Sequence, residues 1–206
     1  RTYDLVVACA GLQADRVATL VGDAADPAIV PFRGEYLALR PERTHLVRGL
    51  IYPVPDPRYP FLGVHLTRRV DGGVTLGPNA VLALSREGYR RRDVNWADLV
   101  ETLRWPGFAP LAREHWRAGA AEMASSLNRR RFVALARRYL PELELADVVP
   151  APAGVRAQAV DAHGQLVDDF RITRTGRVVN VRNAPSPAAT SSLAIADHII
   201  DGLALG

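Results

Sequence analysis

The sequence of 206 residues has little of what stabilises small secreted proteins or spans membranes. Its single cysteine cannot form an internal disulfide, so we expect a reducing compartment. Cys9 lies in an apolar run, where a small buried side chain is its expected role. No apolar run approaches the roughly 20 residues that span a bilayer. The five histidines lie far apart, without the spacing of metal ligands, so no metal site is expected.

The N-terminal sequence RTYDLVVACAG has no initiator methionine and no features of a signal peptide. A chain that opens in this way is expected to be a piece of a longer protein. Together with the single cysteine, it favours a cytoplasmic location, and association with the cytoplasmic face of a membrane stays open.

Arginine is plentiful, the formal net charge is +4, and basic runs occur at residues 90–92, 129–131 and 137–138. The last two runs share a stretch whose apolar residues, from Phe132 to Leu140, fall at helical spacing. The arginines therefore occupy the solvated face of a predicted helix. Since no aromatic ladder accompanies them, we expect no nucleic-acid partner. A mild positive field favours a small anionic substrate instead.

The chain begins and ends with segments typical of a nucleotide-binding domain. Residues 3–9 predict a buried strand, Gly11 ends it, and residues 12–20 predict a helix, which together form half of a βαβ unit. After Pro150 the runs GVRAQAV, QLVDDFRI and RVVNVRN predict strands. A final helix follows, with a predicted buried face of Leu193, Ala196, Ile199, Ile200 and Leu203.

The middle of the chain has a different texture. From Ile29, short β-rich runs separated by proline and glycine predict an antiparallel sheet, with PVPDPRYPF as a rigid loop or edge. Residues 95–140 turn helical, with Asn95 as a helix cap. Their predicted inward side chains are Leu99, Val100, Leu103, Phe108, Leu111, Ala112 and the tryptophans at 96, 105 and 116. The fold class is therefore α+β, with residues 28–150 as a separate lobe between residues 1–27 and 151–206.

Four segments carry candidate chemistry. Residues 183–192, NAPSPAATSS, precede the final helix, so they either let a planar ligand approach the backbone or form an ordinary helix cap. Arg156 either clamps a carboxylate in a cavity or pairs at the surface, and Arg33 has the same two roles open, with Glu35 as a possible partner. His65 alternates with Val64 and Leu66, which fits a base in a pocket or a structural histidine.

Successive blocks of the sequence, among them CAGLQADR, IVPFRGEYLALRPE, PAGVRAQAVD and NAPSPAATSSLAIA, cover nearly the whole chain. In this order they resemble the C-terminal half of the L-2-hydroxyglutarate oxidase/dehydrogenase family of the D-amino-acid-oxidase-like flavoproteins. The resemblance implies a bipartite, Rossmann-like FAD-binding domain interrupted by an antiparallel substrate domain. It also implies FAD as cofactor and a small dicarboxylate as substrate, oxidised from L-2-hydroxyglutarate to 2-oxoglutarate.

The resemblance assigns roles to individual residues. Arg156 matches an arginine that holds the substrate carboxylate, although Ala157 stands where the wider group has proline. His65 becomes the candidate base, with Arg33 and Tyr36 as further substrate contacts. The residues expected along the cofactor are Ala10, Gly11, Leu12, Pro185, Ser186, Pro187, Ala188, Ala189 and Thr190.

The G-x-G-x-x-G turn that grips the pyrophosphate in such flavoproteins does not occur in this sequence. We therefore expect this chain alone to hold little flavin and to be inactive. Two alternatives stay open. The first is a related flavoenzyme acting on another 2-hydroxy acid, an amino acid or glycerol 3-phosphate. The second is a non-catalytic domain that binds no flavin. The electron acceptor, oxygen or a membrane quinone, also stays open.

Overall fold

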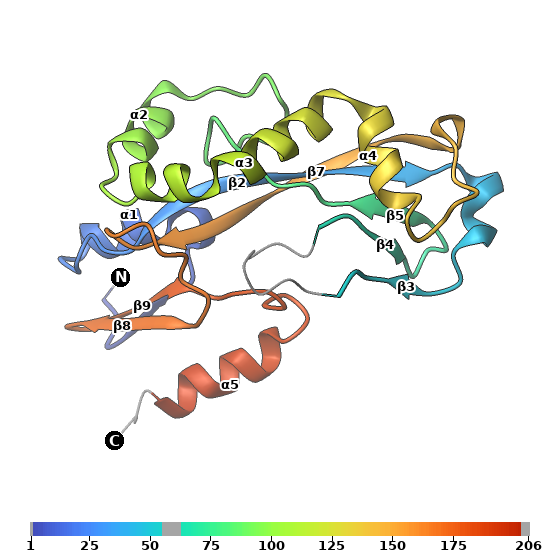
Figure 1. The fold of residues 1–206 in the computed structure, drawn as a ribbon. Coiled ribbons are helices and arrows are strands. Elements are labelled where there is room, and N and C mark those ends of the chain that lie inside the picture. Colours follow the sequence, from blue (N-terminus) through green and yellow to red (C-terminus); the bar gives the residue numbers. More distant parts are fainter. Residues whose placement is uncertain (1, 55–62, 203–206) are drawn as a thin grey trace.

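The computed structural model describes residues 2–54 and 63–202, which fold into two sheets and a layer of helices (Figure 1). The α+β class predicted from the sequence is confirmed. Most of the predicted loop PVPDPRYPF lies outside the described residues. The helices are α1 Ala14–Leu20, α2 Trp96–Arg104, α3 Phe108–Leu127, α4 Arg129–Ala136 and α5 Ser192–Gly202. The 3-10 helices are Gly11–Gln13, Pro41–Leu46 and Leu145–Asp147.

The larger sheet is built on two long antiparallel strands, β2 Ala28–Leu39 and β7 Val148–Val160, which pair from end to end. β5 Val74–Gly77 and β6 Val81–Leu82 pair with the other edge of β2. β4 His65–Arg68 and β3 Leu50–Ile51 extend the sheet beyond β5. All these pairings are antiparallel, as predicted. The domain boundary expected at residue 151 falls inside β7, so residues 151–160 belong to the larger sheet.

The smaller sheet joins the two ends of the chain. β9 Val178–Asn183 lies between β1 Val6–Ala8, which is parallel to it, and β8 Arg171–Thr175, which is antiparallel. The turn predicted at Thr175 and Gly176 connects β8 to β9, and α1 contacts β9. Figure 1 shows this sheet and α5 on the side of the larger sheet that is away from α2, α3 and α4.

The main core lies between the larger sheet and α4. Leu66, Val74 and Leu76 from the strands pack with Phe132 and other buried residues of α4. Burying such side chains stabilises by about 1.5–3 kcal/mol each. The arginines at 129–131 stay exposed on its other face, as predicted, but the helix ends at Ala136, so Arg137 and Arg138 follow it in a turn. The Asn128 side chain caps α4 by accepting from the N–H groups of its first turn.

A smaller core fixes the start of α3 against the end of β7. Leu111 is buried with Val160 there, and Trp105 packs on this pair. The Trp105 indole N–H donates to the carbonyl of Val160 at 3.1 Å. Of the three tryptophans expected in the core, only Trp105 contributes to it.

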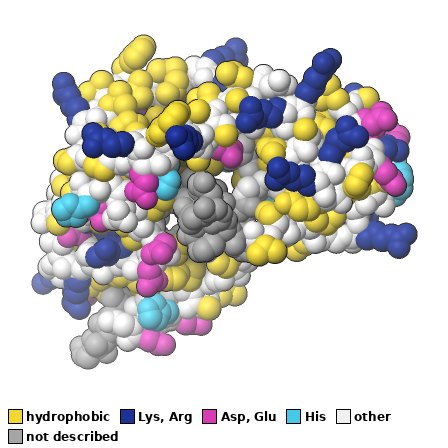
Figure 2. All heavy atoms as spheres, viewed as in Figure 1, with side chains coloured by type: hydrophobic (Ala, Val, Ile, Leu, Met, Phe, Trp, Pro, Cys, Tyr) yellow, Lys and Arg dark blue, Asp and Glu magenta, His cyan; other side chains and the backbone are white. Residues whose placement is uncertain are grey.

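Several apolar side chains that the sequence placed inside are exposed. Trp96 is 73% exposed and Trp116 61% exposed, and Figure 2 shows hydrophobic side chains gathered over α2 and α3. Val100 and Leu103 of the predicted α2 stripe, Ala112 of α3, and Leu193, Ala196 and Ile200 of α5 are likewise exposed, and Leu203 lies outside the described residues. On α5 the one fully buried apolar side chain among the described residues is Ile199.

The first strand and its cysteine are also exposed, against expectation. β1 lies at an edge of the smaller sheet and pairs on one side only, with β9. Val6 and Val7 are therefore partly open to solvent, and the Cys9 thiol is exposed. The apolar composition of this run predicted the strand correctly but not its burial.

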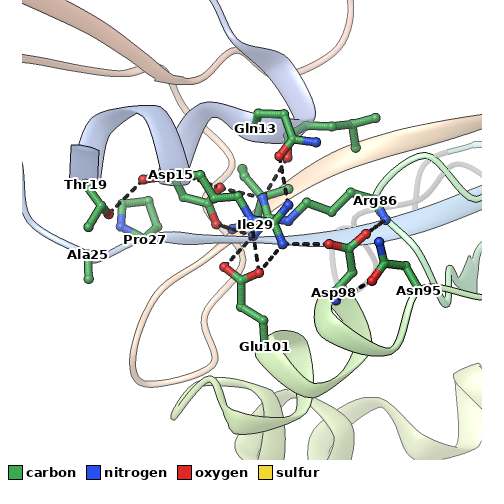
Figure 3. Close-up of polar contacts among 12 residues, drawn as sticks. Gln13, Asp15, Thr19, Ala25, Pro27, Ile29, Arg86, Asn95, Asp98 and Glu101 are labelled. Atoms are coloured by element: carbon green, nitrogen blue, oxygen red, sulfur yellow. Dashed lines mark hydrogen bonds and ion pairs between the residues drawn. The ribbon is translucent and has the colours of Figure 1, made fainter. Parts of the chain in front are cut away.

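A network of ion pairs takes the place of the apolar stripe predicted for α2 (Figure 3). The buried guanidinium of Arg86 donates to both carboxylate oxygens of Asp15 on α1, and also to Glu101 on α2. Asp98 turns inward on α2, where it accepts from the Arg86 backbone N–H and from Arg16. The predicted cap is confirmed, because the Asn95 side chain accepts from the first N–H groups of α2. The helix thus docks through charge, which leaves its apolar side chains outside.

Candidate functional site

A cavity of about 720 Å³, here called the substrate cavity, opens beside the β2–β7 pair. Tyr36 reaches it from β2, His65 from β4 and Arg156 from β7. Ser186, from the segment that follows β9, lies at the same cavity. Four of the residues singled out in the sequence are therefore brought together by elements that are far apart in the chain.

His65 is held in one orientation by two contacts. Its ring stacks on Tyr52 with 4.2 Å between the ring centroids and 18° between the planes. Its Nδ1 lies 3.0 Å from the carbonyl oxygen of Gly63. Because a carbonyl only accepts, the proton sits on Nδ1 and the neutral ring has Nε2 left as an acceptor.

The surroundings favour the neutral form of His65. Burial lowers the pKa of the imidazole below 6.5, and the positive charge of Arg156 lowers it further, against the contact with Gly63. The imidazole is therefore neutral at pH 7, as a proton acceptor must be.

The charges of Arg156 and Tyr36 affect each other's pKa. Arg156 lies opposite Phe32 in the strand register and is accessible to solvent in the cavity. Partial burial nevertheless lowers the pKa of the guanidinium below its usual range, although the group stays protonated at neutral pH. Burial raises the pKa of the Tyr36 hydroxyl above 10, so that Tyr36 is a neutral hydrogen-bonding group. The cavity thus offers a cation, a neutral base and a hydroxyl.

Glu122, on α3, is a cavity residue that the sequence reasoning missed. Burial raises the pKa of its carboxyl, against a hydrogen bond from the Ala80 N–H at 3.0 Å and the charge of Arg131. Arg138 also lines the cavity, from the residues just after α4. No motif marks either residue. The available signal for Glu122 was an acid within the small-residue run Ala118 to Ala124 of a helix.

Arg33 does not line the substrate cavity with Arg156, so the structure does not bring the two predicted anchors together. Successive side chains of a strand leave it on opposite faces, and Phe32 and Gly34 are the neighbours that line the substrate cavity. Arg33 is buried and forms an ion pair with Glu35 at 3.1 Å. The alternative of a pairing with Glu35 is confirmed.

The segment expected at the flavin ring is a turn leading into α5. The Thr190 hydroxyl and the Ser191 N–H both donate to the carbonyl of Pro187, each at 3.1 Å, and α5 begins at Ser192. Ser186, Pro187, Ala189 and Thr190 are exposed. Four of the six predicted residues from Pro185 to Thr190 are therefore open to solvent, and Ser186 lines the cavity.

The residues expected along the cofactor near the N-terminus lie where β1 passes into the first 3-10 helix. Gly11 has a φ of +52°, which favours glycine, and a side chain there would meet no described atom within 4 Å. The carbonyl of Leu12 accepts from Arg86 at 2.7 Å, and Ala10 is half-buried. Arg86 therefore anchors this turn at Leu12, while the space next to Gly11 is open.

Among the described residues there is neither a metal-binding cluster nor a membrane-spanning helix. No group of three or more histidine, cysteine, aspartate or glutamate side chains in that part of the chain could hold a metal ion. No helix among the same residues is long and apolar enough to cross a bilayer.

Comparison with known proteins identifies relatives of the whole chain. The chain is 54% identical over 199 residues to the mitochondrial L-2-hydroxyglutarate dehydrogenase of Caenorhabditis elegans. The match covers 94% of this chain and 46% of the relative. It is 50% identical over 195 residues to the L-2-hydroxyglutarate dehydrogenase of Escherichia coli strain K12, covering 95% and 46%. The chain thus spans about half the length of these relatives.

The fold has a counterpart among solved structures. Dithionite-reduced L-alpha-glycerophosphate oxidase from Mycoplasma pneumoniae with FAD bound matches with a TM-score of 0.59 at 20% identity, covering 95% of this chain and 41% of that chain. The model of the FAD dependent oxidoreductase family, DAO, matches residues 1–201. The chain belongs to this family of FAD dependent oxidoreductases.

Proposed function

We propose that the protein to which this chain contributes oxidises L-2-hydroxyglutarate to 2-oxoglutarate with FAD as its cofactor. The observation that carries the proposal is the substrate cavity, which unites the Arg156 cation, the neutral His65 base and Ser186 of the expected flavin segment. The identities of 54% and 50% to L-2-hydroxyglutarate dehydrogenases support this choice of substrate.

The residues present fit one side of a flavin site. Ser186 lies at the cavity, Pro187, Ala189 and Thr190 are exposed, and a Cβ at Gly11 would meet nothing within 4 Å. Residues 185–190 would lie beside the flavin ring and residues 10–12 along the cofactor. Bound FAD supplies the acceptor for the hydride that leaves the substrate. Since the sequence has no G-x-G-x-x-G turn, we expect this chain by itself to hold flavin weakly and to be inactive.

The protein side chains bind the substrate and take its proton. Arg156 is placed to bind the carboxylate next to the hydroxyl-bearing carbon through its two-pronged guanidinium. Nε2 of His65 accepts the hydroxyl proton, while Tyr52 and the Gly63 carbonyl keep the ring in position. A dicarboxylate needs a second cation, and Arg138 takes the role that the sequence had assigned to Arg33.

The wider organisation follows from the same proposal. The larger sheet with α2, α3 and α4 forms the substrate domain. The smaller sheet with α1 and α5 forms part of the FAD-binding domain, and the change of domain lies after β7. A cytoplasmic location stays a prediction.

The test is anaerobic stopped-flow reduction of the flavin-loaded, full-length protein. Replacing His65→Gln should slow flavin reduction by roughly 10²–10⁴, because the base is lost. His45→Gln is a matched control, since the Nδ1 of His45 also contacts a carbonyl, that of Glu42 at 2.9 Å, but lies outside the cavity. If His65→Gln binds flavin and is reduced at the parent rate, His65 is structural.

Further measurements test the pH dependence, the substrate and the bound flavin. Burial holds the pKa of His65 below 6.5. The rate of flavin reduction should therefore be independent of pH well above 6.5 and should fall as the pH drops through the lowered pKa. Arg156→Lys should reduce kcat/KM for L-2-hydroxyglutarate roughly ten- to hundredfold, because the fork is lost. A panel with glycerol 3-phosphate, a second 2-hydroxy acid and amino acids tests the related-enzyme alternative. A colourless full-length protein would support a non-catalytic domain instead.

A further inference from the structure

A second cavity, of about 490 Å³, is lined by four arginines and is called the arginine cavity here. Arg33 lines it from β2, Arg90 and Arg91 from the segment before α2, and Arg129 from the first residue of α4. Residues 150–153 of β7 and the end of α3 complete the wall. This volume lies within the range of small-molecule binding sites in proteins, roughly 300–1,000 Å³.

The arginine cavity has more positive than negative charge. Its one acidic lining residue is Glu35, whose carboxylate is shared by Arg33 at 3.1 Å and Arg91 at 2.9 Å. Burial would raise the pKa of Glu35, but hydrogen bonds from Arg91, Ser126 and Asn79 lower it below 4.5, so Glu35 is ionised. One negative charge therefore faces four positive ones.

Two of the guanidinium groups are left without a carboxylate. Within residues 2–54 and 63–202, the side chains of Arg90 and Arg129 form no ion pair. Like charges that converge on a partly enclosed space repel each other, and a bound anion would relieve that repulsion. Guanidinium forks match the geometry of carboxylates and phosphates. Arg33, buried and pinned by Glu35 and the carbonyl of Arg90, gives the site a fixed cationic wall.

We propose that the arginine cavity binds a small multivalent anion, a polycarboxylate or a phosphate compound. Tyr36 lines both cavities, but Arg156 and His65 do not line the arginine cavity, and this proposal does not depend on the proposed function. A hydrogen-bonded pair of residues nevertheless links the walls of the two cavities. The Asn79 side chain lines the substrate cavity and exchanges two hydrogen bonds with Glu35, at 2.8 and 3.1 Å. An anion that draws Arg91 away from Glu35 would be sensed there.

The test is isothermal titration of the purified protein with citrate and, separately, with inorganic phosphate at low ionic strength. Saturable single-site binding of either anion is expected, and the stronger of the two identifies the ligand class. Arg129→Gln and Arg90→Gln should each weaken binding by about threefold or more, as expected for partly exposed charges. Circular dichroism confirms that each variant remains folded.

Two control variants keep the outcome specific. Arg130→Gln removes an adjacent exposed charge of α4 that does not line the cavity, and it should change the dissociation constant by less than about twofold. Arg156→Lys should likewise leave binding intact, which separates this site from the substrate cavity. The proposal is overturned if neither anion saturates by about 10 mM, which is weaker than ordinary specific binding. It is also overturned if Arg130→Gln or Arg156→Lys weakens binding as much as Arg129→Gln.

Discussion

Replacing Asp15→Ala removes the centre of the network that joins α1 to α2. The Asp15 carboxylate accepts from the Arg86 guanidinium, at 2.8 Å for one of its two contacts, and from the backbone N–H groups of Arg16 and Ile29, each at 2.8 Å. The Ile29 contact also fixes the start of β2. The variant therefore weakens the contacts that hold α1, α2 and the start of β2 together.

The size of the loss follows from what Arg86 retains. Its guanidinium would stay buried with the carbonyl of Leu12 and with Glu101, whose side chain is 45% exposed. Breaking a buried pair on one side costs about 3–5 kcal/mol, and the surviving contacts place this case near the lower figure. An unfolding free energy of about 5–15 kcal/mol would thus lose a large fraction.

Urea unfolding followed by circular dichroism measures this change. With a slope of about 3 kcal/mol/M, the midpoint should fall by about 1 M. The control is Asp71→Ala, because the Arg69–Asp71 pair is exposed on both sides and should change stability by less than about 1 kcal/mol. The double variant Asp15→Ala with Arg86→Met should lose less unfolding free energy than the sum of the losses of the two single variants. A midpoint for Asp15→Ala equal to that of Asp71→Ala would refute the role given to the network.

Two further predictions concern stability. Gly107→Ala should destabilise the protein, because a Cβ there would lie 1.9 Å from the carbonyl oxygen of Asp161, whereas Gly119→Ala on α3 meets nothing and should stabilise by about 0.5–1 kcal/mol; equal midpoints in urea would contradict this. Burial would raise the pKa values of Asp15 and Glu35, but their hydrogen-bond donors lower both, so their stabilisation is present above about pH 4 and is lost as the pH falls through the lowered values. Unfolding free energies that stay constant from pH 7 to about pH 3 would contradict that assignment.

Local patterns predicted the elements better than they predicted burial. The period of apolar residues around Phe132 identified α4 and its buried face, because Phe132, Val133 and Ala136 pack into the main core against the sheet. The stripe of α2 misled, because Asp98 and Thr102 face inward to reach Arg86 and the rest of the network. The periodicity of a sequence cannot show that an acidic side chain pairs with a buried arginine from another segment.

The same reasoning explains which site residues were predictable. Arg156 was a candidate because it lies in the block PAGVRAQAVD, and His65 because it alternates with Val64 and Leu66; the fold brings both to one cavity. The alternation of Phe32, Arg33 and Gly34 already implied that Arg33 points away from its neighbours. It did not say which face borders the cavity. Glu122 has no motif, and only the packing of α3 against the sheet brings it into the site.

The geometry of the substrate cavity depends on contacts made far from it. Tyr36 and Arg156 sit on the β2–β7 pair, whereas Ser186 follows β9 of the smaller sheet. Arg182, fully buried in β9, donates to the carbonyl of Ala24 at 2.8 Å and to that of Pro27 at 2.6 Å, just before β2 begins. The segment that carries Ser186 is thereby fixed to the strand that carries Tyr36. A cation outside the cavity thus helps to set the distance between Ser186 and the β2–β7 pair.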